Sequence, residues 1–207
     1  TEASTVYLSG AARTTAVTVG DVDRALYEDR SIVKQLAMRR TRFVLPRDLL
    51  PFAWGSASAR VALSERKKIA KDLVASGVTA DPDAWLAAAA DSIREVLVGE
   101  ALPAQEIRRR CPPEIDVRVD PAPGSKRGGE SPILPRLLTW LGAEGAIVRG
   151  ENDGHWRTSR PRWLPMEAWL GTSPEPMNAE SGYAELVRRW LVTFGPGTET
   201  DIVWWLG

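Results

Sequence analysis

The sequence predicts a mainly α-helical fold with short β-hairpin wings, an α+β class built from tandem winged-helix units. Helical segments are followed twice by a pair of short strand-like runs, which is the order of elements in a winged helix. The two pairs also resemble each other. Ile-Val-Lys at 32–34 matches Ile-Val-Arg at 147–149, and a Leu-Pro pair follows each, at 45–46 and at 164–165.

The first winged-helix unit is expected to cover residues 1–78. A short amphipathic helix is predicted over 18–27, where a Thr or a Gly begins it. Two β-favouring runs on either side of a basic turn form a hairpin, the first wing, at about 32–45. A helical period follows over 57–76, and Gly77 ends it. This order places helices on both sides of the wing.

The second unit is expected to cover residues 79–170. Asp81-Pro82 is a strong helix start, an N-cap acceptor followed by Pro at the first helical position. The segment 131–143 has its apolar residues at the spacing of one helical face, which predicts the recognition helix of this unit. The Asn-Asp-Gly turn at 152–154 predicts a hairpin, the second wing, at about 146–164.

Residues 171–207 predict a linking helix over 178–193 and the start of a third winged-helix unit after the Gly-Pro-Gly break at 195–197. The sequence has no initiator Met, and it stops at Gly207 within a helical pattern. We therefore expect the chain to be a fragment of a longer protein.

Composition narrows the class of protein. The 207 residues include one Cys and one His, too few for a disulfide framework or a Cys/His zinc site. No apolar run approaches the roughly 20 residues of a membrane span, and unpaired Cys usage fits a cytoplasmic protein. A Gly-rich nucleotide fingerprint and a nucleophile elbow are also missing, which argues against kinases, Rossmann enzymes and hydrolases. We expect no cofactor, metal or membrane partner.

The net charge is zero, but the charges lie in blocks. Residues 31–72 carry ten basic and three acidic side chains, a sum of +7. Residues 107–162 carry eleven basic and seven acidic ones, a sum of +4. A neutral protein with such blocks can present basic faces to a polyanion, although the same blocks also suit ordinary solvated surfaces.

The first wing carries Arg39, Arg40 and Arg42 at its tip and on its return strand. The planar guanidinium binds phosphate oxygens through two parallel hydrogen bonds, so these residues are candidate contacts to the DNA backbone. The alternative is an exposed turn whose charges keep the protein in solution.

Further candidates lie in the second unit. Lys126 and Arg127 belong to a Gly-rich loop that could bring backbone N–H groups and charge close to a phosphate. Arg136 and Thr139 lie opposite the apolar face of the predicted recognition helix, where they would face the major groove. A mobile loop and a solvated helix face are the respective alternatives.

On the second wing, Arg157, Arg160 and Arg162 alternate with Trp156 and Trp163. Basic and aromatic side chains interleaved on strands suit contact with a DNA backbone or a displaced base. Hairpin Trp residues also pack into a neighbouring core, and we assign Trp163 to the core.

Several segments together resemble a known family, and they occur in order along the chain: 23–30, 36–41, 144–150, 162–170 and 185–191. They are similar to the bacterial winged-helix DNA-binding-domain family that includes crosslink-unhooking, azinomycin-resistance type DNA glycosylases. The resemblance implies three tandem winged helices around a concave channel for duplex DNA, damaged by alkylation or crosslinking. It also implies hydrolysis of the N-glycosidic bond.

Glycosylase activity in that family depends on a Gln-x-Gln or Gln-x-Asp motif that activates water at the sugar. The resemblance places its second member near Thr1 and its first member upstream. A Thr hydroxyl stays protonated near neutral pH and cannot take a proton from water as a carboxylate can. The sequence therefore identifies no catalytic residue. A non-catalytic winged-helix transcriptional regulator and a protein-binding scaffold remain as alternatives.

Overall fold

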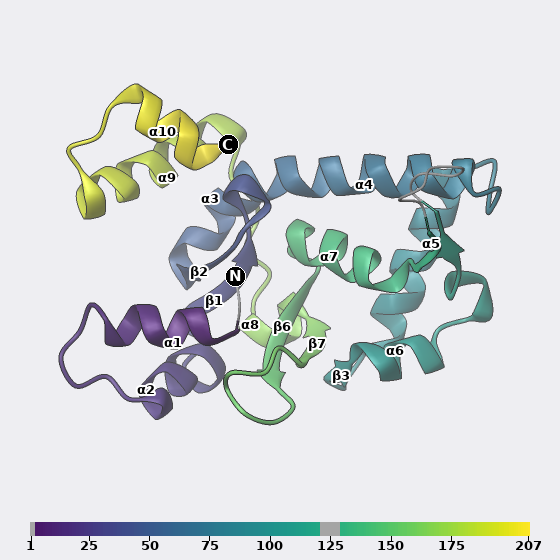
Figure 1. The fold of residues 1–207 in the computed structure, drawn as a ribbon, viewed down its shortest axis with the longest axis horizontal. Helices are drawn as coiled ribbons and strands as arrows, with labels where there is room; N and C mark the ends of the chain where they lie inside the picture. The colour runs from purple at the N-terminus through teal and green to yellow at the C-terminus, as the bar shows by residue number, and fades with distance from the viewer. Residues whose placement is uncertain (1–2, 121–128) are drawn as a thin grey trace.

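The computed structural model describes residues 3–120 and 129–207 (Figure 1). These residues form a mainly helical fold with small antiparallel sheets. The helices of five residues or more are α1 (Ala3–Ala11), α2 (Val19–Asp23), the π-helical turn Arg24–Glu28, α3 (Leu50–Trp54), α4 (Ala57–Ala75), α5 (Pro82–Val96), α6 (Ala104–Arg110), α7 (Leu134–Glu144), α8 (Met166–Leu170), α9 (Ala179–Phe194) and α10 (Glu199–Leu206). The strands are β1 (Ile32–Leu36), β2 (Arg42–Pro46), β3 (Leu102–Pro103), β4 (Arg118–Val119), β5 (Ser131–Pro132), β6 (Ile147–Asn152) and β7 (Pro161–Pro165).

Two helices precede the first hairpin. Thr18 caps α2, and its hydroxyl and the Asp21 carboxylate bond each other's backbone N–H in a capping box. The predicted helix over 18–27 is thus confirmed, with the π-helical turn as its second half. The helix α1 was not predicted, and it buries Tyr7 against Val22 and Leu26.

The first hairpin is confirmed. Strands β1 and β2 pair antiparallel from Ile32 opposite Pro46 to Leu36 opposite Arg42. A 3-10 turn joins them, and its residues Arg39 and Arg40 have φ angles of 54° and 53°, in the left-handed region. Those angles are unfavourable for residues other than glycine, so tertiary contacts must hold the turn in place.

The long helix α4 lies along α7 and contacts α5 (Figure 1). Ser-Gly at 76–77 ends α4 as predicted, and Asp81 caps α5 by accepting a hydrogen bond from the N–H of Ala84. Fully buried aliphatic side chains on these helices form the larger core: Ile69, Leu73, Leu86, Ile93, Leu97, Leu137, Leu138 and Leu141.

The second hairpin is also confirmed, as β6 paired with β7 from Ile147 opposite Pro165 to Arg149 opposite Trp163. The short strand β3 adds to β7 and gives the order β3-β7-β6. Polar and apolar residues alternate over 114–120, but this stretch forms only the two-residue strand β4, because a 3-10 turn takes up its beginning.

The two hairpins share a core. Val33 of β1 and Val148 of β6 pack into one cluster with Leu50, Trp169 and Leu186. This cluster keeps β1 and β6 close together (Figure 1). Trp163 is buried in the larger core, as expected for a hairpin Trp.

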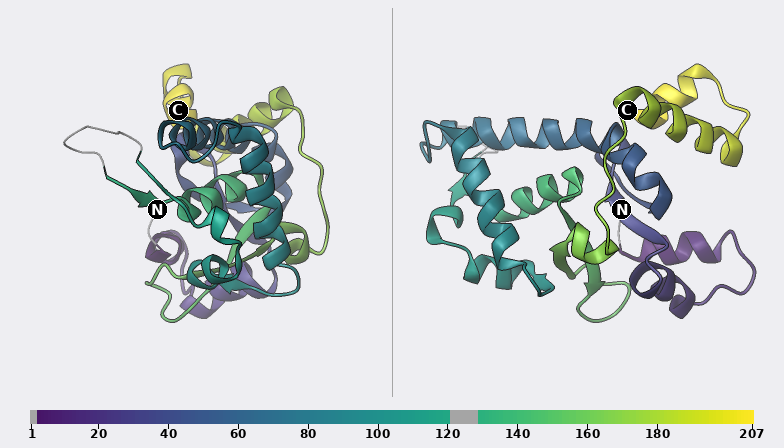
Figure 2. Two further views of the ribbon diagram at one scale, coloured as in Figure 1. Left: turned by 90° about the vertical axis from the view of Figure 1, so that its right-hand side faces the viewer. Right: turned by 180° about the vertical axis from the view of Figure 1, so that it is seen from behind.

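Helices α9 and α10 lie at the end of the molecule away from α5 and α6 (Figure 2). Asn178 caps α9 and Thr198 caps α10, which confirms the predicted linking helix and the following helix start. Helix α10 contacts the turn of the first hairpin. None of the helices in the described part of the chain is long and apolar enough to cross a bilayer.

Candidate functional site

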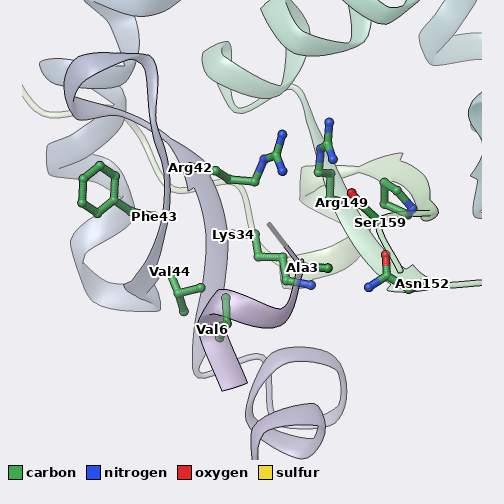
Figure 3. A pocket seen from close by; sticks show the side chains of 10 residues that line it. Ala3, Val6, Lys34, Arg42, Phe43, Val44, Arg149, Asn152 and Ser159 are labelled. Carbon is green, nitrogen blue, oxygen red and sulfur yellow. The ribbon is translucent and has the colours of Figure 1, made fainter. Parts of the chain in front are cut away.

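Three basic side chains from the two hairpins converge on one pocket (Figure 3). Lys34 comes from β1, Arg42 from β2 and Arg149 from β6. The pocket has a volume of about 30 Å³, and Ala3 and Val6 of α1 form part of its wall. We call the three basic residues the cationic cluster. It brings together side chains that lie more than a hundred residues apart in the chain.

Strand alternation explains why Lys34 faces this pocket. Val33 and Gln35 point into the protein and are almost fully buried, so Lys34 points to the opposite face of β1. Gln35 is held there because its amide nitrogen donates to the carbonyl oxygens of Gly142 at 3.1 Å and of Ala143 at 3.2 Å. These carbonyls belong to the last turn of α7, where the Gly142 carbonyl also accepts from the N–H of Gly145.

The cationic cluster is electrostatically strained. Burial and the nearby charge of Arg149 lower the pKa of Lys34 to about 8, although Asp23 opposes the shift. Burial and the charge of Arg42 lower the pKa of Arg149 to about 10. Burial also lowers the pKa of Arg42. Half-buried cations that repel one another are the arrangement that a bound anion would stabilise.

Aromatic rings border the cluster on both sides. The guanidinium of Arg149 lies 4.7 Å from the centre of the Trp163 ring. The ammonium of Lys34 donates a hydrogen bond of 2.6 Å to the Tyr27 hydroxyl. On the far side of that tyrosine, the Tyr7 hydroxyl donates to Asp23 at 2.6 Å. The rings limit how far the basic side chains can swing, so the charges stay directed at the pocket.

The surface is hollowed further along β7. Arg42 and Arg149 also line a broader hollow together with Arg160 and Trp163. Thr139 of α7 lines a third hollow with the cationic cluster. Of the residues predicted to contact DNA, the structure therefore brings Arg42, Thr139 and Arg160 to one continuous region.

Two predicted contacts of the first wing have partners within the protein. Arg40 binds the carboxylate of Glu65 on α4 through two hydrogen bonds of 2.8 and 2.9 Å. The Glu65 side chain is only 2% exposed. Burial raises the pKa of Glu65, but the bonds from Arg40 and Lys68 outweigh burial and lower it. Arg39 stacks on the Trp204 ring of α10 at 4.1 Å.

Two predicted contacts from residues 79–170 repeat this pattern. Arg136 forms an ion pair of 2.8 Å with Asp72, so it ties α7 to α4 and does not present a free guanidinium to a groove. Arg162 pairs with Asp153 at 2.6 Å. Arg157 lies over the Trp156 ring at 5.7 Å and remains exposed.

The remaining predicted contacts, Lys126 and Arg127, lie outside the described residues, as does Thr1. Within the described ranges no group of His, Cys, Asp and Glu side chains could hold a metal ion.

Lys34 and Arg149 were missed as site residues, although the sequence carried a signal for them. Each is the third residue of the repeated Ile-Val-basic triplet at 32–34 and 147–149. The same position of the first strand in each hairpin therefore places a basic side chain in the shared pocket. The repeat indicated a related fold, and its basic third position also indicated the site.

Comparisons with known proteins place these features in a family context. The family model described as DNA glycosylase AlkZ-like matches the chain over residues 1–207. The fold is similar to the solved structure of the Streptomyces sahachiroi DNA glycosylase AlkZ, with a TM-score of 0.58 and 19% sequence identity. That match covers 91% of this chain and 46% of the other, so this chain spans about half the length of that protein. No curated protein gives a significant match.

A first prediction concerns the charge coupling in the cluster. In the Arg149→Gln variant the pKa of Lys34 should rise above its value of about 8, because one of the two like charges that lower it is removed. Burial remains, so the pKa should stay below that of an exposed lysine. NMR titration of the lysine side chains measures the shift. Arg160→Gln, on an exposed residue at the rim, is the control, and an equal shift in both variants would contradict direct coupling.

A second prediction concerns Arg40. The Arg40→Ala variant should lose about 1–3 kcal/mol of unfolding free energy, because the buried Glu65 carboxylate loses two hydrogen bonds. Arg24→Ala removes a solvent-exposed ion pair with Asp21 and should cost clearly less. Urea unfolding compares the two variants. Equal small losses would show that Lys68 alone satisfies Glu65.

Proposed function

The chain belongs to the AlkZ-like DNA glycosylase family, and on that premise we propose that it binds duplex DNA and takes part in releasing alkylated or crosslinked bases. The observation that carries the proposal is the cationic cluster of Lys34, Arg42 and Arg149. Duplex DNA is a dense array of phosphates, and phosphates are the anions that such a cluster would stabilise. Arg is well suited to this contact because its planar fork matches two phosphate oxygens.

The proposal assigns the two hairpins the role of wings in tandem winged-helix units. The units would cover 1–78 and 79–170, with 171–207 as a linking helix and the start of a third. Support comes from the position of the cationic cluster between the two hairpins. A duplex following both hairpins would place its backbone over the cluster and over Arg160 at the edge of the broader hollow.

In this proposal the family's Gln-x-Gln or Gln-x-Asp motif activates the water for base release. The resemblance places that motif at and upstream of Thr1. The pocket is lined by Ala3 and Val6, so the first turn of α1 lies close to the cationic cluster. This position supports an arrangement in which the cluster holds phosphates while residues near the start of α1 act at the sugar. The basic character of the shared pocket favours a nucleic-acid partner over a protein-binding scaffold.

A third prediction tests DNA binding. The triple variant Lys34→Gln, Arg42→Gln, Arg149→Gln should bind duplex DNA much more weakly, whatever the sequence. Its slope of log K against log salt should flatten by about one unit for each phosphate that the variant no longer neutralises. The matched control is Arg66→Gln, Arg94→Gln, Arg188→Gln, which removes the same charge from exposed helix faces. Equal weakening in both variants would contradict a specific site and leave only general electrostatic attraction.

A fourth prediction tests the chemistry. The protein should release bases from alkylated and crosslinked duplex, and the triple Gln variant of the cluster should lose this activity at substrate concentrations below saturation. Chromatography of released bases measures the reaction. If the protein binds such DNA with the expected salt slope but releases no base at any concentration, the proposed glycosylase activity is contradicted. A non-catalytic DNA-binding protein then remains.

A further inference from the structure

Lys34 differs from the two arginines of the cluster because it carries a primary amine that can become a nucleophile. We propose that Lys34 forms an imine with the aldehyde of an abasic site, and that the protein therefore cleaves DNA strands at abasic sites. The inference rests on the proposed function in one respect, that duplex DNA enters the cationic cluster. It adds a lyase reaction and a residue that performs it.

The geometry places this amine between groups suited to the neighbouring phosphates. Lys34 lies in the pocket beside Arg42 and Arg149, whose guanidinium groups lie on the same side of it (Figure 3). An abasic sugar in a DNA strand has a phosphate on each side. With phosphates held at the two arginines, the sugar between them would meet the amine. Ala3 and Val44 form an apolar part of the wall beside the amine.

The surroundings of Lys34 also make it reactive. An amine attacks a carbonyl only in its neutral form, and desolvation next to other cations is a known way to supply that form. With a pKa of about 8, about a tenth of Lys34 is neutral at pH 7, whereas an ordinary exposed lysine is almost wholly charged. Arg42 and Arg149 thus have two effects, since they attract phosphate and favour the neutral amine.

A hydrogen-bonded chain offers the departing proton a path. The Lys34 ammonium donates to the Tyr27 hydroxyl at 2.6 Å. Tyr27 and Tyr7 share a hydrogen bond, and the Tyr7 hydroxyl donates to the Asp23 carboxylate at 2.6 Å. Asp23 lines a separate hollow together with Glu28 and Glu151. The chain connects the amine to a carboxylate outside the cationic pocket.

The reaction balances without a cofactor. The neutral Lys34 nitrogen bonds to C1′ of the ring-opened sugar, and the aldehyde oxygen leaves as water with both amine protons. The imine takes up a proton, which lets solvent remove a proton from C2′. The electron pair left on C2′ forms a double bond to C3′, and the C3′–O bond breaks with the phosphate as leaving group. Water then hydrolyses the imine, which releases the unsaturated aldehyde and returns the amine.

Reductive trapping tests this step. The protein is mixed with a duplex that holds one abasic site, prepared in advance by removing a uracil, and borohydride is added. Hydride reduces an imine to a stable secondary amine, so a covalent protein–DNA adduct should appear on a denaturing gel. Peptide mass spectrometry should place the sugar remnant on Lys34. Lys34→Arg keeps the charge but should lose the adduct, whereas Lys71→Arg, on an exposed face of α4, should keep it.

The pH profile separates a nucleophile from a merely structural lysine. The trapping rate should rise with pH and level off above about 8, as the amine loses its proton. In Arg149→Gln the same profile should move to higher pH. The inference is overturned if no adduct forms with bound abasic duplex, if Lys34→Arg leaves the adduct intact, or if the adduct maps to another residue.

These outcomes are independent of base release, because the abasic site is supplied ready-made. A protein that forms the adduct but releases no alkylated base contradicts the proposed glycosylase and supports the lyase step. A protein that releases bases but forms no adduct supports the proposed glycosylase and contradicts the lyase step.

Discussion

The arrangement of the site depends on one buried amide. Gln35 is 1% exposed, and its nitrogen donates to two carbonyl oxygens in the last turn of α7. Helix ends leave some carbonyls without a partner in the helix, and an unsatisfied buried group costs about 1–3 kcal/mol. The bond therefore fixes the register of β1 against α7. Because side chains alternate along a strand, fixing Gln35 inside also fixes Lys34 outside, toward Arg149. Arg42 joins the same face because β2 pairs with β1, with Arg42 opposite Leu36.

The cationic cluster opposes folding, because burial removes water from all three cations and Lys34 also faces the like charges of Arg149 and Arg42. The shared core beneath them holds the hairpins together against this repulsion, with Val33 from β1 and Val148 from β6 in one cluster. A natural protein retains such strain where it serves a function. A bound phosphate would offset the repulsion, so relief of this electrostatic strain would contribute to the binding free energy.

Local signals in the sequence predicted most elements, because caps, turns and apolar spacing are set by nearby residues. The capping box at Thr18, the start at Asp81-Pro82 and both hairpins are examples. The partners of the basic side chains could not be predicted from local signals. The partners of Arg40 and Arg136 both lie on α4, at Glu65 and Asp72, far away in sequence. Only packing brings them together.

Some basic residues of the charge blocks pair with carboxylates of the protein, whereas others line the pocket. This difference changes how the charge blocks should be interpreted. Arg40, Arg136 and Arg162 direct their charge to carboxylates of the protein, and binding a phosphate there would first require breaking an ion pair. Counterion release is therefore expected to be smaller than the number of basic residues in the two blocks suggests. A neutral chain can thus bind a polyanion through a few side chains, provided that packing gathers them at one place on the surface.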